Sequence, residues 1–583
     1  MLHTLSRSLR ENKGPALVTV LLSALEVVFE IVIPLFMSNL IDFGIEGGSM
    51  AAVWKFGAFL LLLAAFQLST GVLAARIAAR ASVGFAANLR EDMYNNVQTF
   101  AFSNIDKFST ASIVTRLTTD TTNVQNAFQM LMRMAIRAPV MLIFSMIVSF
   151  RISRDISMTF LIILPILAVA LFFIIRSVFP IFTRVFRTYD ELNNVVQENV
   201  RGIRVVKSFN QEQHEIRKFA AISERIYKDF SKGERLITLN APLMQFCIYT
   251  CMIVISWLGA KAIIASGNVP ALGMTTGNLT ALITYAMQIL SSLMMLSMVF
   301  AMLTISRSPA RRIAEVLEER SDIPQPEQPV MTVRDGAVDF DHVSFVYASK
   351  ADKKVLDDID LHIRSGETIG IIGGTGASKS SLVQLIPRLY DVTGGKLTLG
   401  GVDVRDYDLD TLRGAVAMVL QKNELFSGTI AENLRWGNEN ATDEELQHAC
   451  VLACADEFIS AMPDGYDTHI EQGGTNVSGG QKQRLCIARA LLKKPKVLIL
   501  DDSTSAVDTR TDAQIQQALS TYIPDTTKII IAQRISSVQN ADRIVVLDDG
   551  HIDAVGCHDE LLRTCEIYRE VYESQQKGGE DDA

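Results

Sequence analysis

The sequence predicts a multidomain membrane protein in which an all-α domain with six membrane spans precedes an α/β domain. Long apolar runs occupy most of residues 1–300, while residues 335–583 have the composition of a water-soluble domain. The mean hydropathy of the 583-residue chain is +0.23, which is typical of a partly membrane-embedded protein. In the second half, short continuous apolar runs are typical of buried parallel strands, and one of them leads into a glycine-rich loop.

Composition and charge limit the function classes. Hydrophobic residues make up 49% of the chain and charged residues 20%, which excludes a disordered or fibrous protein. Asp+Glu (64) outnumber Lys+Arg (55), giving a net charge of −9. A nucleic-acid-binding protein usually carries a basic excess, so the charge balance disfavours that class. The acidic end at 576–583 is predicted to be a solvated tail.

Six apolar runs are long enough to cross a bilayer, since a span needs about 20 residues. The first is too long for the core of a signal peptide. The connections at 42–51, 151–155 and 267–277 hold few cations, whereas 76–129 and 180–241 are rich in Lys and Arg. The positive-inside rule therefore places both termini in the cytoplasm. The predicted spans are about 16–41, 52–75, 130–150, 156–179, 242–266 and 278–304.

The long polar stretches keep a helical periodicity at 76–105 and 184–235, so we expect membrane helices that continue into the cytoplasm. Each pair is expected to meet at a small turn, near 105–115 and near 210–215. The sixth helix continues to Glu319. Three prolines at 323–329 then mark a linker, because proline lacks the backbone N–H and disfavours the helix interior, so that three close together break a helix. The predicted boundaries are a membrane domain at 1–320, a linker at 321–334, an α/β domain at 335–575 and the tail at 576–583.

The seven cysteines are predicted to be reduced thiols. The pairs 247/251 and 450/454 are spaced for one helix face but lack partners at zinc spacing, so a metal site is disfavoured. In the α/β domain the expected strands are Val338–Tyr347, Val355–Ile363, Thr368–Ile372, Val497–Leu500 and Lys528–Ala532.

The segment 368–382 contains a phosphate-binding loop between a buried strand and a helix predicted to reach Leu389. Its pattern follows G-x-x-x-x-G-K-[ST], except that Ser378 replaces the second glycine, which is expected to strain the turn or crowd the phosphate. Lys379 is expected to reach the β- and γ-phosphates, and Ser380 to hold Mg²⁺. The expected ATP-binding residues of this loop are Gly373, Gly374, Thr375, Gly376, Ala377, Ser378, Lys379, Ser380 and Ser381.

An apolar strand at 497–500 ends in Asp501 and Asp502. A carboxylate delivered by a buried strand to a phosphate site is the expected second protein ligand of Mg²⁺, and we assign that role to Asp501.

Between these motifs, residues 476–485 read Asn-Val-Ser-Gly-Gly-Gln-Lys-Gln-Arg-Leu and open a helix predicted to end at Leu492. Here the chain resembles the ABC transporter ATPases. Ser478, Gly479, Gly480 and Gln481 are similar to the signature motif of that family, which binds the γ-phosphate of ATP held by the opposite subunit.

Further motifs match the family in order. The resemblance implies that Tyr347 stacks on adenine and that Gln421 contacts Mg²⁺ from the Q-loop. It also implies that the segment 505–508, ending in Asp508, is the D-loop. The segments 115–120 and 198–209 are similar to the intracellular segments of ABC exporters. The resemblance covers nearly the whole chain and implies an exporter half-transporter that uses ATP and Mg²⁺.

Three positions depart from the family pattern. The family's general base is a Glu, where this chain has Asp502, and its switch residue is a His, where this chain has Gln533. With Ser378, these changes all fall in the ATP site of this chain's own core, whereas the signature motif is intact. The pattern resembles the degenerate-site subunit of heterodimeric bacterial multidrug ABC exporters, which implies that hydrolysis occurs mainly at the partner's core.

Polar groups in the membrane half suggest interpretations for cargo. Glu26 and Glu30 lie on one helix face and could attract cations, or form a structural pair with polar groups of a neighbouring helix; we favour the second. Arg133 and Arg137 are expected to snorkel or pair at the inner face. A methionine-rich sixth helix suits a promiscuous surface, although packing or lipid contact is the simpler interpretation; its residues are Met287, Gln288, Ser291, Ser292, Met294, Met295, Met298 and Met302.

Together these features predict ATP-driven export of small hydrophobic or amphipathic compounds by a dimer, favouring a heterodimer, in a bacterial plasma membrane with the ATPase domain in the cytoplasm. Two alternatives remain open at the sequence level. One is a homodimeric lipid or lipopeptide flippase, and the other is a nucleotide-gated regulator without transport.

Overall fold

A computed structural model describes residues 1–270, 273–347, 354–374, 376–503 and 506–580. The chain divides into two compact units. The first comprises Met1–Gln98 and Thr110–Glu319, and the second comprises Thr99–Ser109 and Arg320–Ala583. A short segment from the first half of the sequence therefore belongs to the second unit.

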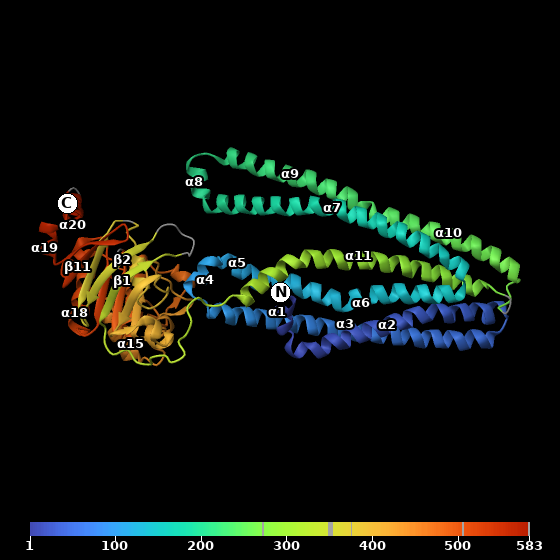
Figure 1. The fold of residues 1–583 in the computed structure, drawn as a ribbon, viewed down its shortest axis with the longest axis horizontal. Helices are drawn as coiled ribbons and strands as arrows, with labels where there is room; N and C mark the ends of the chain where they lie inside the picture. Colours follow the sequence, from blue (N-terminus) through green and yellow to red (C-terminus); the bar gives the residue numbers. More distant parts are fainter. Residues whose placement is uncertain (271–272, 348–353, 375, 504–505, 581–583) are drawn as a thin grey trace. The chain divides into compact units, whose positions relative to one another are not determined.

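The first unit is all helical (Figure 1). Six helices in the described residues are long and apolar enough to cross a membrane, which confirms the predicted number, and each predicted span lies within one of them. The elements are α1 (Leu2–Arg7), η1 (Arg10–Asn12), α2 (Lys13–Asn39), η2 (Leu40–Glu46), α3 (Met50–Gln98), α5 (Thr110–Thr115), η3 (Arg116–Asp120), α6 (Thr121–Ile152), α7 (Arg154–Arg201), α8 (Ile203–Ser208), α9 (Glu212–Thr238), α10 (Asn240–Ser266) and α11 (Thr276–Glu318).

Several of these helices are much longer than a bilayer. The 49 residues of α3 span about 74 Å, against about 30 Å of hydrocarbon, so the helix continues beyond the membrane. The turn expected near 210–215 lies earlier, because α9 begins at Glu212; α8 and residues 209–211 form the connection. The turn expected near 105–115 contains α4 (Phe102–Lys107), and α5 already begins at Thr110.

Within this unit, α7, α8 and α9 form an arm whose free end is separated from the bundle of α2, α3, α6 and α11 (Figure 1). Phe160, Leu167, Ile255 and Leu282 pack with their neighbours in a buried cluster of α7, α10 and α11. The outward faces carry exposed apolar side chains, among them Trp257, which is 71% exposed. Such faces are suited to lipid.

The second unit combines two main sheets with helices. Its elements are α4, β1 (Val338–Phe345), β2 (Leu356–Ile363), β3 (Thr368–Gly373), α12 (Lys379–Gln384), β4 (Gly394–Leu399), β5 (Val402–Asp403), η4 (Val404–Asp406), α13 (Leu409–Ala415), β6 (Val416–Val419), β7 (Gly428–Thr429), α14 (Ile430–Arg435), α15 (Asp443–Leu452), α16 (Asp456–Ser460), η5 (Gly465–Asp467), β8 (His469–Ile470), η6 (Gln472–Gly474), α17 (Gly479–Leu492), β9 (Val497–Asp501), α18 (Thr509–Tyr522), β10 (Thr527–Ile531), η7 (Ile535–Ser537), β11 (Arg543–Asp548), β12 (His551–Gly556), α19 (His558–Thr564) and α20 (Glu566–Glu580).

The larger sheet has the order β12-β11-β3-β10-β9-β6, and all its strands except β12 are parallel. A smaller antiparallel sheet has the order β2-β1-β4-β5. The helix after the phosphate loop is shorter than predicted. It ends at Gln384 instead of Leu389, because Pro387 lacks the N–H that a continuing helix needs.

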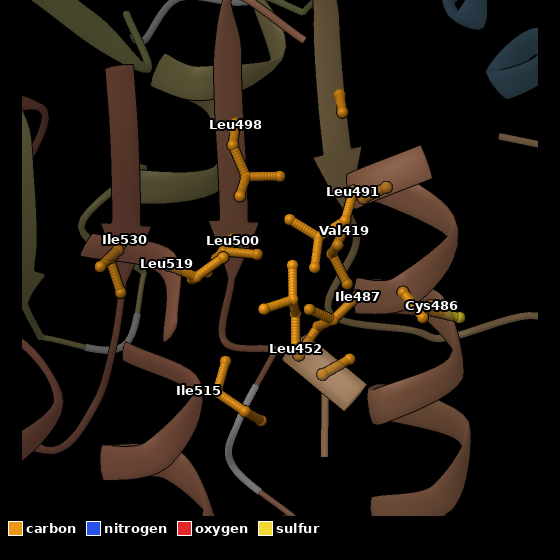
Figure 2. Close-up of a cluster of buried hydrophobic side chains, with 14 of the residues drawn as sticks. Val419, Leu452, Cys486, Ile487, Leu491, Leu498, Leu500, Ile515, Leu519 and Ile530 are labelled. Atoms are coloured by element: carbon orange, nitrogen blue, oxygen red, sulfur yellow. The ribbon is translucent and has the colours of Figure 1, made fainter. Parts of the chain in front are cut away.

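The parallel sheet is buried on both faces. On one face, Leu498, Leu500 and Ile530 of the sheet meet side chains from α15, α17 and α18 (Figure 2). On the other, β3 and α12 pack with the antiparallel sheet. This double burial explains why the strands read as uninterrupted apolar runs.

Candidate nucleotide-binding site

Sheet order assembles the site. The strands β3, β10, β9 and β6 are neighbours and parallel, so their carboxyl ends lie at one edge. β3 leads into the phosphate loop, β10 precedes Gln533, β9 delivers Asp501, and β6 precedes Gln421. Ligands of open α/β sheets bind outside this edge.

The phosphate loop keeps space beside its glycines. A side chain at Gly374 or Gly376 would meet nothing within 4 Å, and Gly376 has a left-handed φ of +90°. At Gly373, by contrast, a Cβ would lie 2.2 Å from the Leu547 carbonyl oxygen. Lys379 donates from Nζ to the carbonyl oxygens of Gly373 (2.8 Å) and Gly374 (2.9 Å). Thr375 lies outside the described residues.

Ser378 occupies the position where the motif calls for glycine, and its backbone explains that requirement. Its φ is +66° and ψ +22°, in the left-handed region. That conformation costs a residue with a side chain roughly 1–2 kcal/mol. The expected strain at this turn is therefore present. Ala377 beside it is buried, as is Ser381.

The pair Asp501 and Ser380 fits a divalent cation. Asp501 is 3% exposed at the end of β9, and burial raises the pKa of its carboxyl, while a hydrogen bond with the Ser380 side chain opposes that rise. A hydroxyl and a buried carboxylate are oxygen ligands of the kind that Mg²⁺ prefers. Burial likewise lowers the pKa of Lys379.

Asp502 and Gln533, the two altered positions, bond directly to each other. The Gln533 amide donates from Nε2 to Asp502 Oδ2 at 2.8 Å. Gln421 donates to the same oxygen at 3.4 Å, so it faces Asp502 here. Asp502 has a φ of +48°, and its N–H donates to the Ile531 carbonyl, which ties it to β10. Two amides therefore converge on the carboxylate at the predicted general-base position.

The signature segment forms the start of the 14-residue helix α17. Ser478 and Gln481 bond reciprocally in a capping box, through Ser478 N–H to Gln481 Oε1 (2.9 Å) and Gln481 N–H to Ser478 Oγ (3.3 Å). Gly480 is required sterically, because a Cβ there would lie 2.8 Å from the Ala506 carbonyl oxygen. Gly479 also faces Ala506. The glycines let the segment at 506 approach the helix start.

Asp508, which is predicted to lie in the D-loop, caps α18. Its carboxylate accepts from the Thr511 N–H at 2.9 Å and from the Thr511 hydroxyl at 2.7 Å, which lowers the pKa of Asp508. The neighbouring Ala506 N–H donates to Gln483 Oε1 at 3.0 Å and so joins this loop to α17. Ser505, also in the predicted D-loop, lies outside the described residues.

Tyr347 is half exposed at the end of β1, and its hydroxyl contacts Ser381 Oγ at 2.7 Å. Its ring meets Tyr390 edge to face at a centroid distance of 5.1 Å. Tyr390 in turn stacks with Phe102 of α4 and donates to Asp106 Oδ2 at 2.8 Å. Sequence reasoning missed Tyr390, which lies in no motif; its contacts with Tyr347 and α4 distinguish it.

In the first unit, Arg137 of α6 bridges the two acidic residues of α2. Its Nη1 lies 2.7 Å from Glu26 Oε1, and its Nη2 lies 2.7 Å from Glu30 Oε2. The acidic pair therefore has a cationic partner on a neighbouring helix, as the structural interpretation expects. Arg133 forms no ion pair among the described residues.

The methionine-rich face of α11 is mixed in exposure. Met287, Met294 and Met298 are exposed, while Gln288 and Ser292 bond within the bundle. The interpretation of this face as a cargo surface stays a prediction.

Comparisons with known proteins cover both units. The family described as "ABC transporter transmembrane region" matches residues 16–293, and the family described as "ABC transporter" matches residues 356–505. The uncharacterized ABC transporter ATP-binding protein YfiB of Bacillus subtilis (strain 168) is 36% identical over 561 residues, covering 96% of each chain. The uncharacterized ABC transporter ATP-binding protein Rv1273c of Mycobacterium tuberculosis (strain ATCC 25618 / H37Rv) is 33% identical over 580 residues, covering 99% of this chain and 98% of the relative.

A solved structure titled "Structure of a bacterial Atm1-family ABC exporter with ATP bound" superposes with a TM-score of 0.82 at 23% identity. It covers 97% of this chain and 99% of its own. At that identity the likeness concerns the fold.

Proposed function

Because this chain belongs to the ABC transporter family, with its transmembrane region fused to its ATPase region, we propose that it is one half of a heterodimeric exporter whose hydrolysis occurs mainly at the partner's core. The chain is an ATPase coupled to transmembrane transport. The proposal adds that its own ATP site holds nucleotide and turns over slowly, while its signature motif serves the partner's ATP.

The bond between Gln533 and Asp502 carries this proposal. A general base must reach the attacking water, and an aspartate is one methylene, about 1.5 Å, shorter than a glutamate. A misplacement of about 1 Å can cost a hundredfold in rate. Asp502 also accepts from two amides, which hold its carboxylate within the protein. A glutamine at 533 can bond a phosphate oxygen but cannot carry a proton.

The remaining residues fit ATP and Mg²⁺. Ser380 and Asp501 would hold the cation, with Gln421 as a third ligand once it leaves Asp502. Bound Mg²⁺ neutralises charge on the β- and γ-phosphates. Lys379, now bonded to loop carbonyls, would turn to the phosphates, and Tyr347 would stack on adenine.

Two surfaces support coupling to the membrane and to a partner. In the second unit, α4 is joined to Tyr390 and through it to Tyr347, so a change at the adenine position has a path of contacts to the segment between α3 and α5. In the first unit, α8 and its flank expose Ile203, Val205 and Phe209, the last 71% exposed. Exposed apolar groups of this kind suit a subunit interface.

We further propose that cargo is small and hydrophobic or amphipathic, and that the ATPase domain lies on the cytoplasmic side of a bacterial plasma membrane. The flexible methionines of α11 suit varied apolar cargo. The cytoplasmic placement of both termini is supported by the even number of spans and by the cation-rich helix extensions.

The test is Mg-ATP hydrolysis in lipid nanodiscs. The chain alone is compared with its Asp502→Glu/Gln533→His variant and with the complex co-purified with its natural partner. We expect negligible activity for the chain alone and strong activity for the complex. Strong activity of the unaltered chain alone would favour the homodimeric flippase.

Two variants inside the complex sharpen the assignment. Asp502→Asn alters this chain's own core, so it should leave hydrolysis nearly unchanged. Ser478→Ala alters the signature motif that serves the partner's ATP, so it should reduce hydrolysis severely. The opposite ranking would contradict the asymmetric assignment. ATP hydrolysis without ATP-driven flux in any pairing would favour the regulator.

A further inference from the structure

Helix α20 bonds to the backbone of the loop that carries Gln533. The Gln575 side chain donates from Nε2 to the Gln533 carbonyl oxygen at 2.7 Å. Its Oε1 accepts from the Ile535 N–H at 2.9 Å. One amide thus satisfies an acceptor and a donor two residues apart, as the backbone of a neighbouring strand would. Only a side chain with both a donor and an acceptor does this.

Helix α20 is itself firmly seated. Tyr568 is fully buried, and its hydroxyl bonds to His558 Nδ1 at 2.8 Å. Val571 and Tyr572 pack against the same core cluster that contains Ile535. Positions 568, 571, 572 and 575 share one face of a helix, so the packing that seats α20 also directs Gln575 toward the loop.

The loop is held from its other end by α18. Ser537 donates from Oγ to Asp512 Oδ2 at 2.6 Å. Residues 533–537 are therefore bonded on one side by Gln575 and on the other by the helix that follows Asp508. Between these points, the side chain of Gln533 faces Asp502.

We propose that Gln575 is a positioning residue of the nucleotide site: it fixes the backbone that aims Gln533 at Asp502, and this slows release of the nucleotide held by this chain's core. The inference rests on the proposed assignment of Gln533 to that site. Without the two hydrogen bonds from Gln575, the loop at 533–537 is less restrained. Nucleotide then leaves faster, even though Gln575 itself does not contact it.

The test uses the full chain in nanodiscs and a fluorescent, non-hydrolysable ATP analogue with Mg²⁺. Two readouts are hydrogen exchange in peptides containing Ile535 and the release rate of the analogue in a chase with unlabelled ATP. The matched control is Gln576→Ala, since Gln576 bonds instead to the Tyr572 hydroxyl. Gln575→Glu keeps the acceptor for the Ile535 N–H but loses the donor to Gln533.

We expect Gln575→Ala to raise both exchange and release about fivefold, which is the effect of one net hydrogen bond. Gln575→Glu should give a smaller increase, and Gln576→Ala none. Release at the wild-type rate in Gln575→Ala would overturn the inference, including where exchange rises, because the bond would then be merely structural. Equal effects of the Ala variants at 575 and 576 would overturn it too. Fast hydrolysis by the unaltered chain alone would refute slow turnover but not this inference, because release of the analogue does not depend on hydrolysis.

Discussion

Removing the Arg137 side chain tests whether the intramembrane carboxylates are structural or face cargo. Arg137 lies 2.7 Å from both Glu26 and Glu30, and the three side chains are only 24%, 11% and 24% exposed. Breaking a buried ion pair by removing one partner costs about 3–5 kcal/mol. Because two of the side chains remain a quarter exposed, we expect the lower end, about 3 kcal/mol, for Arg137→Met. That corresponds to roughly a 150-fold change in the unfolding equilibrium.

The assay is unfolding of the full chain in mixed detergent micelles, followed by circular dichroism as the denaturing detergent increases. Arg133→Met, on the same helix but without an ion pair in the described chain, is the control and should not destabilise. A neutral triple variant, Glu26→Gln/Glu30→Gln/Arg137→Met, should recover stability to within about 1 kcal/mol, because no charge is left unpaired. Wild-type stability of Arg137→Met, together with loss of cationic-cargo transport in Glu30→Gln, would refute the structural interpretation.

Two further predictions concern the phosphate loop. Ser378→Gly should raise the free energy of unfolding by up to about 1.5 kcal/mol, since it removes left-handed strain of roughly 1–2 kcal/mol but adds about 0.5–1 kcal/mol of chain entropy; a lower melting temperature would contradict this. Burial raises the pKa of Asp501 above the ordinary value of about 3.9, so on acidification its carboxyl takes up a proton earlier than an ordinary aspartate and then no longer binds Mg²⁺. The contribution of this group to folding stability runs the other way, because the protonated form is favoured in the folded chain and that stability is lost as the pH rises. Magnesium dependence of ATP binding should therefore weaken on acidification at a higher pH than for an ordinary aspartate, and Asp501→Asn should abolish this pH dependence in Mg²⁺ titrations; an unchanged pH profile in that variant would assign it to another group.

The spans and buried strands could be predicted because both depend on local composition. A membrane helix needs a long apolar run, and a strand buried on both faces needs a short one. The end of α12 before Leu389 could also have been predicted, because Pro387 in the sequence disfavours a continuing helix. The earlier position of the turn before α9 could not be predicted, because residues 209–211 contain no glycine or proline that would mark it.

The motifs let the sequence nominate site residues, and their roles stay predictions, but the contacts between these residues could not be predicted. Gln533 and Asp502 are 31 residues apart, and they meet because β10 pairs beside β9. That pairing is a non-local property of the sheet. Gln575 lies 42 residues from Gln533 and follows no pattern, and Tyr390 is tied to Asp106 across 284 residues. Only the folded chain brings such side chains to the site.

The left-handed backbone at Asp502 and Ser378 makes the aspartate favourable and the serine unfavourable for the stability of the folded chain, relative to the residues of the family pattern. Asp502 has a φ of +48°, and aspartate tolerates the left-handed region better than most residues with a side chain. Replacing the family's glutamate by aspartate therefore eases the backbone and shortens the reach of the base. Ser378 does the reverse, adding strain where glycine has none. Under the proposed roles, both changes are unfavourable for fast hydrolysis, because Asp502 shortens the reach of the predicted base and Ser378 strains the phosphate turn. The proposed function, a site that holds nucleotide and turns over slowly, is compatible with both changes, and the bond from Gln575 to the Gln533 carbonyl is the restraint that we propose for this loop.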